Sequence, residues 1–167
     1  MQRARALLAT ALFLFLAPGT VAGLIPFWIS RWEFRPSFFG LEPVPWLGVI
    51  LIALAAPVLL ESFARFALEG LGTPAPVLPT RHLVVKGFYR YVRNPMYVAV
   101  VSIIIGQGLL LGNGYLLLYA AVVWAAFFGF VLSYEEPKLR KTYGAEYEAY
   151  CARVPRWLPH VTLKTSQ

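Results

Sequence analysis

The chain has 167 residues, of which 59% are hydrophobic and 14% charged, and its mean hydropathy is +0.63. This composition is much more apolar than that of a soluble domain, so we predict an integral membrane protein. The formal net charge is +7. Because the Lys and Arg residues cluster beside apolar segments, anionic lipid headgroups are favoured over nucleic acid as the partner of these cations.

Cysteine and histidine are too few for a disulfide within the chain or a Cys/His metal site, since the sequence holds only Cys151, His82 and His160. We interpret Cys151 as an ordinary small residue on an amphipathic helix. A reactive thiol is the alternative.

Four apolar segments follow one another at residues 6–29, 45–68, 96–111 and 115–133. A helix needs about 20 apolar residues to cross a bilayer, so three segments are long enough and the third is short. Gly112-Asn113-Gly114 separates the last two, which predicts a tight helical hairpin. The fold class is therefore all-α, a polytopic membrane helical bundle with about four transmembrane helices. We divide it into N-terminal helices at 1–69 and a functional core at 70–167.

The first segment has a second interpretation. Arg3 and Arg5, the apolar run after them and Thr20-Val21-Ala22 resemble a signal peptide with a small-residue cleavage site. The apolar run continues past Ala22 to Ile29, which favours a membrane span. Pro18 in this segment and Pro57 in the second are expected to kink their helices, because proline removes a backbone donor.

The distribution of cations predicts a multi-pass protein with both termini in the cytoplasm. With the N-terminus inside, 13 of the 15 Lys and Arg residues fall on the cytoplasmic side, and only Arg31 and Arg35 fall outside. Between the second and third segments, the Pro-rich stretch 70–81 predicts a stiff loop at the membrane face.

Beyond Pro137, apolar residues recur at steps of three or four among Lys, Arg and Glu. This pattern predicts an amphipathic C-terminal helix at the membrane interface, broken at Pro155 and Pro159.

A candidate anion site lies where the third segment begins. Pro95 suits the first position of a helix, and Asn94 is placed to cap it with its side-chain oxygen. The helix start presents unpaired N–H groups, and Arg90 and Arg93 stand just before it. These groups suit a carboxylate or phosphate. The alternative is that the two arginines only anchor lipid phosphates.

Glu135 and Glu136 close the fourth segment on the same predicted side, where a carboxylate is costly unless it is paired or used. Adjacent helical residues point about 100° apart, so we expect one to bind a ligand while the other forms a salt bridge. The alternative is a purely structural pair with Arg90 or Arg93. Glu61 is a weaker candidate partner.

Gly106-Gln107-Gly108 lies inside the third segment. It allows another group to approach the backbone and supplies an amide side chain within the bilayer. Close helix packing is the alternative.

Several of these elements together resemble the isoprenylcysteine carboxyl methyltransferase family and its bacterial relatives, which are related to phospholipid methyltransferases. The resemblance covers about residues 70–160. It rests on the segments Gly72-Thr73-Pro74-Ala75-Pro76, Leu83 to Tyr97, Glu135-Glu136-Pro137-Lys138-Leu139, Tyr143-Gly144-Ala145-Glu146-Tyr147, Tyr150 and Val154-Pro155-Arg156.

The resemblance implies an integral membrane methyltransferase that uses S-adenosyl-L-methionine without a Rossmann domain and acts on a lipidic or membrane-partitioned acceptor. It assigns no catalytic residue. Together with the helix-start argument, it predicts these cofactor-binding residues: Arg90, Arg93, Asn94, Tyr97, Gly106, Gln107, Gly108, Glu135, Glu136, Tyr147, Tyr150 and Arg156.

Two positions depart from the family pattern and leave the acceptor open. Asn94 stands where many members have His, and Phe130 stands where the eukaryotic carboxyl methyltransferases have Arg. The acceptor group can therefore be a carboxylate, a thiol or an amine. The alternatives are a phospholipid N-methyltransferase, a non-catalytic membrane protein that retains the fold, and a sterol-type reductase.

Overall fold

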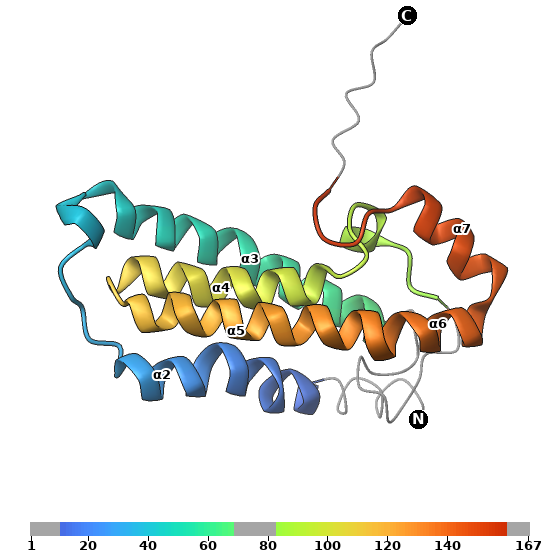
Figure 1. Cartoon of the computed structure of the whole chain (residues 1–167), viewed down its shortest axis with the longest axis horizontal. Coiled ribbons are helices and arrows are strands. Elements are labelled where there is room, and N and C mark those ends of the chain that lie inside the picture. Colours follow the sequence, from blue (N-terminus) through green and yellow to red (C-terminus); the bar gives the residue numbers. More distant parts are fainter. Residues whose placement is uncertain (1–10, 69–82, 160–167) are drawn as a thin grey trace, which may run out of the picture.

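The computed structural model describes residues 11–68 and 83–159, and all regular structure within these ranges is helical. Long helices lie side by side, and the C-terminal helices gather at one end of the bundle (Figure 1). The elements are the first helix Ala11–Ser30, which includes η1 (Thr20–Leu24) and α2 (Ile25–Ser30), then η2 (Phe38–Gly40), α3 (Pro43–Leu68), η3 (Gly87–Arg90), α4 (Pro95–Leu110), α5 (Gly114–Phe130), η4 (Val131–Glu135), α6 (Glu136–Tyr143) and α7 (Ala145–Arg153).

Three of the described helices are long and apolar enough to cross a membrane: Ala11–Ser30, Pro43–Arg65 and Gly114–Tyr143. The third predicted segment forms α4, an apolar helix of 16 residues. The all-α membrane bundle and the short third segment are therefore confirmed. The predicted loop at 70–81 lies outside the described residues, and the division between 69 and 70 stays a prediction.

The core joins α3, α4 and α5. Its buried side chains include Leu59 and Phe63 of α3, Ile104 of α4 and Val123 of α5. The helices α3 and α4 cross closely. A Cβ added at Gly106 of α4 would lie only 2.8 Å from the Gly48 carbonyl oxygen of α3, so only glycine fits without a shift. Small residues at such a crossing let two membrane helices touch along their backbones.

The first helix is irregular where proline and glycine predicted it. Pro18 and Gly19 precede the π-helical segment η1, whose wider turn disturbs the regular hydrogen-bond ladder. Gln107 of α4 donates to the Ala22 carbonyl at 2.7 Å, and Tyr119 of α5 donates to the Val21 carbonyl at 3.0 Å. These bonds satisfy backbone carbonyls within the apolar layer. In α3, by contrast, the helix continues through Pro57.

The prediction of a single amphipathic helix after Pro137 is wrong, because this segment forms two helices, α6 and α7, which meet at Gly144. Gly144 has φ +51°, a conformation that glycine adopts readily and that ends the first helix. The predicted end before Pro155 is confirmed, because α7 stops at Arg153.

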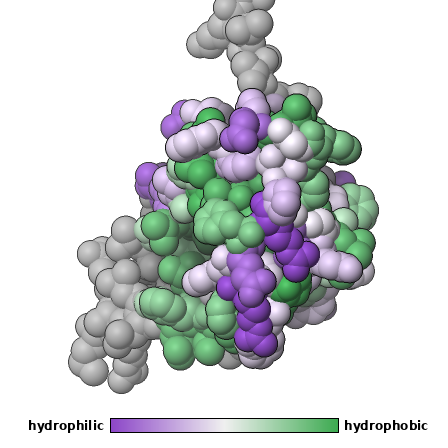
Figure 2. Space-filling model, turned by 90° about the vertical axis from the view of Figure 1, so that its left-hand side faces the viewer, coloured by the Kyte–Doolittle hydropathy of each residue, from purple (hydrophilic) through white to green (hydrophobic). Residues whose placement is uncertain are grey.

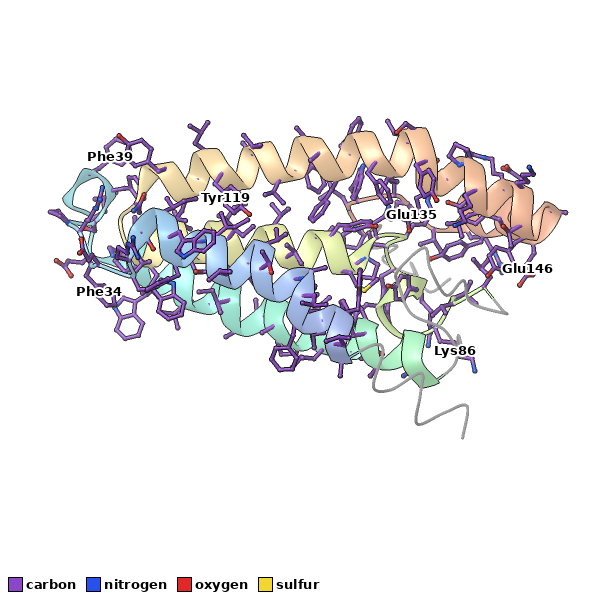
Figure 3. All side chains as sticks on the ribbon, turned by 90° about the horizontal axis from the view of Figure 1, so that it is seen from below. Phe34, Phe39, Lys86, Tyr119, Glu135 and Glu146 are labelled. Carbon is purple, nitrogen blue, oxygen red and sulfur yellow. The ribbon has the colours of Figure 1, made fainter. Side chains whose placement is uncertain are left out.

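The two ends of the bundle carry different groups. At one end the backbone N–H of Arg35 donates to the Leu111 carbonyl at 3.1 Å, which ties the loop after the first helix to the α4–α5 turn. Viewed onto this end, hydrophilic residues lie among hydrophobic ones (Figure 2). Phe34 and Phe39 lie here, whereas Lys86, Glu135 and Glu146 lie at the opposite end (Figure 3). Arg35 and Lys86 thus lie at opposite ends of the bundle, as the predicted distribution of cations requires.

Candidate functional site

Glu136 is the centre of a buried ion-pair network. Its side chain is 3% exposed, and it accepts from Arg93 Nη1 at 3.0 Å and from Arg156 Nε at 2.6 Å and Nη2 at 3.0 Å. Arg140, one turn further along α6, lies 3.4 Å away. A buried carboxylate requires such partners. The network therefore connects the segment before α4, the first turn of α6 and the C-terminal tail.

The start of α4 is held by the tail rather than by its own cap. Pro95 occupies the first turn as predicted, but the predicted Asn94 side-chain cap is wrong. The Asn94 amide instead donates to the Arg156 carbonyl at 3.1 Å, and the backbone N–H of Arg93 donates to the Pro155 carbonyl at 2.9 Å. These two bonds compete with capping because they draw the segment toward the tail.

Glu135 faces a different partner from its neighbour. It is half-buried and accepts from the Tyr97 hydroxyl at 2.8 Å. The Tyr97 ring packs on Phe127, with ring centroids 4.6 Å apart. The two glutamates thus divide as the helix geometry predicts, with Glu136 in the ion-pair network and Glu135 beside Tyr97.

Tyr147 and Tyr150 form the buried face of α7, beneath the network. The Tyr150 hydroxyl donates to the Tyr89 carbonyl at 2.7 Å, which joins α7 to η3. Burial raises the pKa of both phenols, and for Tyr147 a hydrogen bond with Cys151 adds to the effect. The hydrogen bond with Glu136 raises the pKa of Arg156. All three groups therefore keep their protons at neutral pH.

Eight of the expected site residues come together, and we call them the polar cluster: Arg93, Asn94, Tyr97, Glu135, Glu136, Tyr147, Tyr150 and Arg156. The other four expected site residues lie apart from it. Arg90 is exposed and stacks over Tyr91, with its guanidinium carbon 5.9 Å from the ring centroid. Gly106 and Gly108 face other helices at close range, and Gln107 binds the first helix. Gly106 is 12 residues beyond Asn94, or about 18 Å at 1.5 Å per residue.

Sequence reasoning missed two members of the polar cluster, Cys151 and Arg140. Arg93 Nη1 donates to Cys151 Sγ at 2.9 Å, so Cys151 belongs to the polar cluster. Arg140 flanks Glu136. The available signal was spacing: Cys151 follows Tyr147 by four residues and so shares its helix face.

A partly open apolar cavity of about 150 Å³ lies beside Tyr97. The first helix contributes Phe13, Ala17, Pro18 and Val21 to its wall, and α3, α4 and α5 supply the rest. Among the described residues that line it, only Tyr97 carries a polar side-chain group. Because the Tyr97 hydroxyl binds Glu135, this tyrosine stands between the polar cluster and the apolar space.

Comparison with known proteins gives the family. Residues 44–146 match the phospholipid methyltransferase family, and the chain belongs to it. The chain is 40% identical over 78 residues to a protein-S-isoprenylcysteine O-methyltransferase of Schizosaccharomyces pombe. This match covers 46% of the present chain and 33% of the yeast protein. The chain is 35% identical over 80 residues to protein-S-isoprenylcysteine O-methyltransferase B of Arabidopsis thaliana, covering 47% of this chain and 40% of that protein. The matched regions thus span well under half of either relative.

Proposed function

We propose that this chain is an integral membrane methyltransferase that uses S-adenosyl-L-methionine and acts on a lipidic or membrane-partitioned small acceptor. The observation that carries the proposal is that the adjacent residues Glu136 and Glu135 have different partners. Glu136 ties the site together through Arg93 and Arg156, which leaves Glu135 beside Tyr97 for a ligand. Membership of the phospholipid methyltransferase family supports the reaction class.

The Arg93 guanidinium and the Glu135 carboxylate suit the polar groups of this cofactor. Arg93 Nε is buried and has no hydrogen-bond acceptor among the described residues, so its N–H remains available for a carboxylate. Glu135 uses one carboxylate oxygen for Tyr97, and its other oxygen suits an ammonium group or ribose hydroxyls. We therefore propose Arg93 for the cofactor carboxylate and Glu135 for its cationic or hydroxyl groups.

When bound, S-adenosyl-L-methionine supplies an electrophilic methyl group on a positively charged sulfur. The protein's part in such a transfer is to align the acceptor and exclude water. Tyr147, Tyr150 and the Arg156 segment close the polar cluster on the tail side, and the aromatic pair Tyr97–Phe127 closes it on the bilayer side. Gly106, Gln107 and Gly108 serve helix packing in this proposal rather than contact with the cofactor.

Affinity for the cofactor tests the assignment of Glu135. Glu135→Gln keeps an oxygen for Tyr97 but loses the charge. We expect it to weaken S-adenosyl-L-methionine binding about tenfold to a hundredfold, as a charged hydrogen bond is worth about 1.5–3 kcal/mol. The control is Glu146→Gln, which changes an exposed glutamate on α7. Unchanged affinity in a folded Glu135→Gln protein would rule the assignment out.

The acceptor has a second candidate class. The family match favours a phospholipid amine, whereas the two relatives carry names that specify O-methylation of protein-S-isoprenylcysteine. Incubating the protein in native lipid with methyl-labelled S-adenosyl-L-methionine separates the two. Labelled headgroups in the lipid extract would identify a phospholipid N-methyltransferase, and base-labile methyl esters would identify a carboxyl methyltransferase.

A further inference from the structure

Among the described residues, Tyr97 is the one that both lines the apolar cavity and hydrogen-bonds to Glu135. Its ring lines the apolar space, while its hydroxyl donates to Glu135 at 2.8 Å. An amphipathic molecule whose polar head lies at Glu135 would therefore have its apolar part in this cavity.

We infer that the cavity holds the apolar part of the methyl acceptor, and that the first helix limits the buried portion of this part to about the size of a six-carbon ring. The inference rests on the proposed function and adds a substrate class to it. The size follows from the volume of about 150 Å³, since an apolar cavity of about this volume in another protein accepts benzene.

Four of the nine described residues that line the cavity wall belong to the first helix, which lies outside the family match at residues 44–146. The Phe13 ring stacks on Phe63 of α3, with ring centroids 6.1 Å apart, and so closes one side. Selection of the acceptor by size is thus a property of this chain's own N-terminal segment.

The position of that wall is fixed by two hydrogen bonds. Val21 lines the cavity, and its carbonyl accepts from Tyr119, while the next carbonyl, that of Ala22, accepts from Gln107. Because these donors come from α5 and α4, the irregular segment η1 is held against the same helices that complete the cavity. This gives Gln107 a role in acceptor selection that needs no contact with the cofactor.

The test is a series of acceptors with carboxylate, thiol and amine heads, each with unbranched chains from ethyl to octyl and a farnesyl member. Methyl transfer from labelled S-adenosyl-L-methionine is measured for each. Burial of one methylene is worth about 0.8 kcal/mol, so kcat/KM should rise about fourfold per methylene up to about hexyl and then level off. Ala17→Leu, which fills the cavity, should move the plateau to shorter chains.

The matched control is Ala11→Leu, an exposed position on the same helix that does not line the cavity. It should leave the profile unchanged. Phe13→Ala should extend the plateau to longer chains, with Phe15→Ala, a 76% exposed neighbour, as its control. A steady rise to farnesyl that neither cavity variant alters would overturn the inference, as would a protein that binds the cofactor but methylates none of the series.

A second measurement separates this inference from the proposed function. Fluorobenzene binding, followed by ¹⁹F NMR, needs no cofactor. The inference requires binding to the unmodified protein and to Ala11→Leu and its loss in Ala17→Leu, and absence of binding to the unmodified protein overturns it. Failure of S-adenosyl-L-methionine to bind would instead overturn the proposed function.

Discussion

Arg156 and Glu136 are joined by two hydrogen bonds, Nε to Oε1 at 2.6 Å and Nη2 to Oε2 at 3.0 Å. This paired geometry is the strong form of an arginine–carboxylate contact. It fixes the tail against the first turn of α6, and the Arg156 carbonyl accepts from the Asn94 amide on the same side. One residue of the tail thus holds both the carboxylate and the start of α4.

Glu136→Gln should therefore destabilise the protein strongly. The change leaves Arg93 and Arg156 without their counter-charge, and breaking a buried pair in this way costs about 3–5 kcal/mol. Thermal unfolding in detergent measures the loss. Glu148→Gln is the control, because Glu148 pairs with Arg140 at 2.8 Å but both side chains are exposed, so its loss should cost below about 1 kcal/mol. Equal effects of the two changes would contradict the central role of Glu136.

Gly87→Ala should also destabilise the fold, for a steric reason. Gly87 has φ +60°, and a Cβ there would collide with the Glu61 carboxylate. The left-handed backbone alone costs about 1–2 kcal/mol for alanine. Because the Glu61 carboxylate ends a flexible side chain and is able to shift, we expect a total near this range in an unfolding experiment.

The control for Gly87→Ala is Gly129→Ala in α5. A Cβ at Gly129 meets nothing within 4 Å. Since alanine favours a helix by about 1 kcal/mol over glycine, this change should be neutral or stabilising. A neutral Gly87→Ala would show that η3 adapts without strain.

Hydrophobic length and charge predicted most of the architecture. They gave the spans, the hairpin and the placing of Arg93 at the same end as the two glutamates, because these depend on helix length and on which end each residue occupies. They left open which glutamate pairs with which arginine. Local sequence did not reveal which way Asn94 points or that Cys151 joins the cluster. Both depend on where the tail returns, which is a long-range contact. The break at Gly144 was visible as a glycine, but its positive φ was not, since glycine also fits inside a helix at modest cost.

Alkaline pH should destabilise the tail through its buried tyrosines. The pKa of Tyr150 is raised by burial above its unfolded value of about 10. A group with a raised folded pKa contributes stability that is complete below the unfolded pKa and is lost as pH rises toward the folded pKa. Stability should therefore be constant with respect to this group below about pH 10 and fall above it.

Tyr150→Phe tests this assignment. It removes the hydrogen bond to the Tyr89 carbonyl, which should cost about 1 kcal/mol at neutral pH. It should also flatten the fall above pH 10 relative to the unmodified protein. Tyr115→Phe, at a 67% exposed tyrosine of α5, is the control. An unchanged alkaline slope in Tyr150→Phe would assign that slope to other groups.

The orientation of the bundle yields the last prediction. The polar cluster shares its end with Lys86 and Glu146, and the loop with Phe34 and Phe39 lies at the other end (Figure 3). The positive-inside rule predicts that the cluster faces the cytoplasm, where a charged cofactor would reach it without crossing the bilayer. A membrane-impermeant maleimide on intact cells should then label Glu33→Cys but not Glu146→Cys, each in a Cys151→Ser background. Both positions are exposed, so permeabilised cells should show labelling of both and serve as the control. Labelling of Glu146→Cys alone on intact cells would reverse the orientation and, because it would put the cluster outside, would also argue against a cytoplasmic methyl donor.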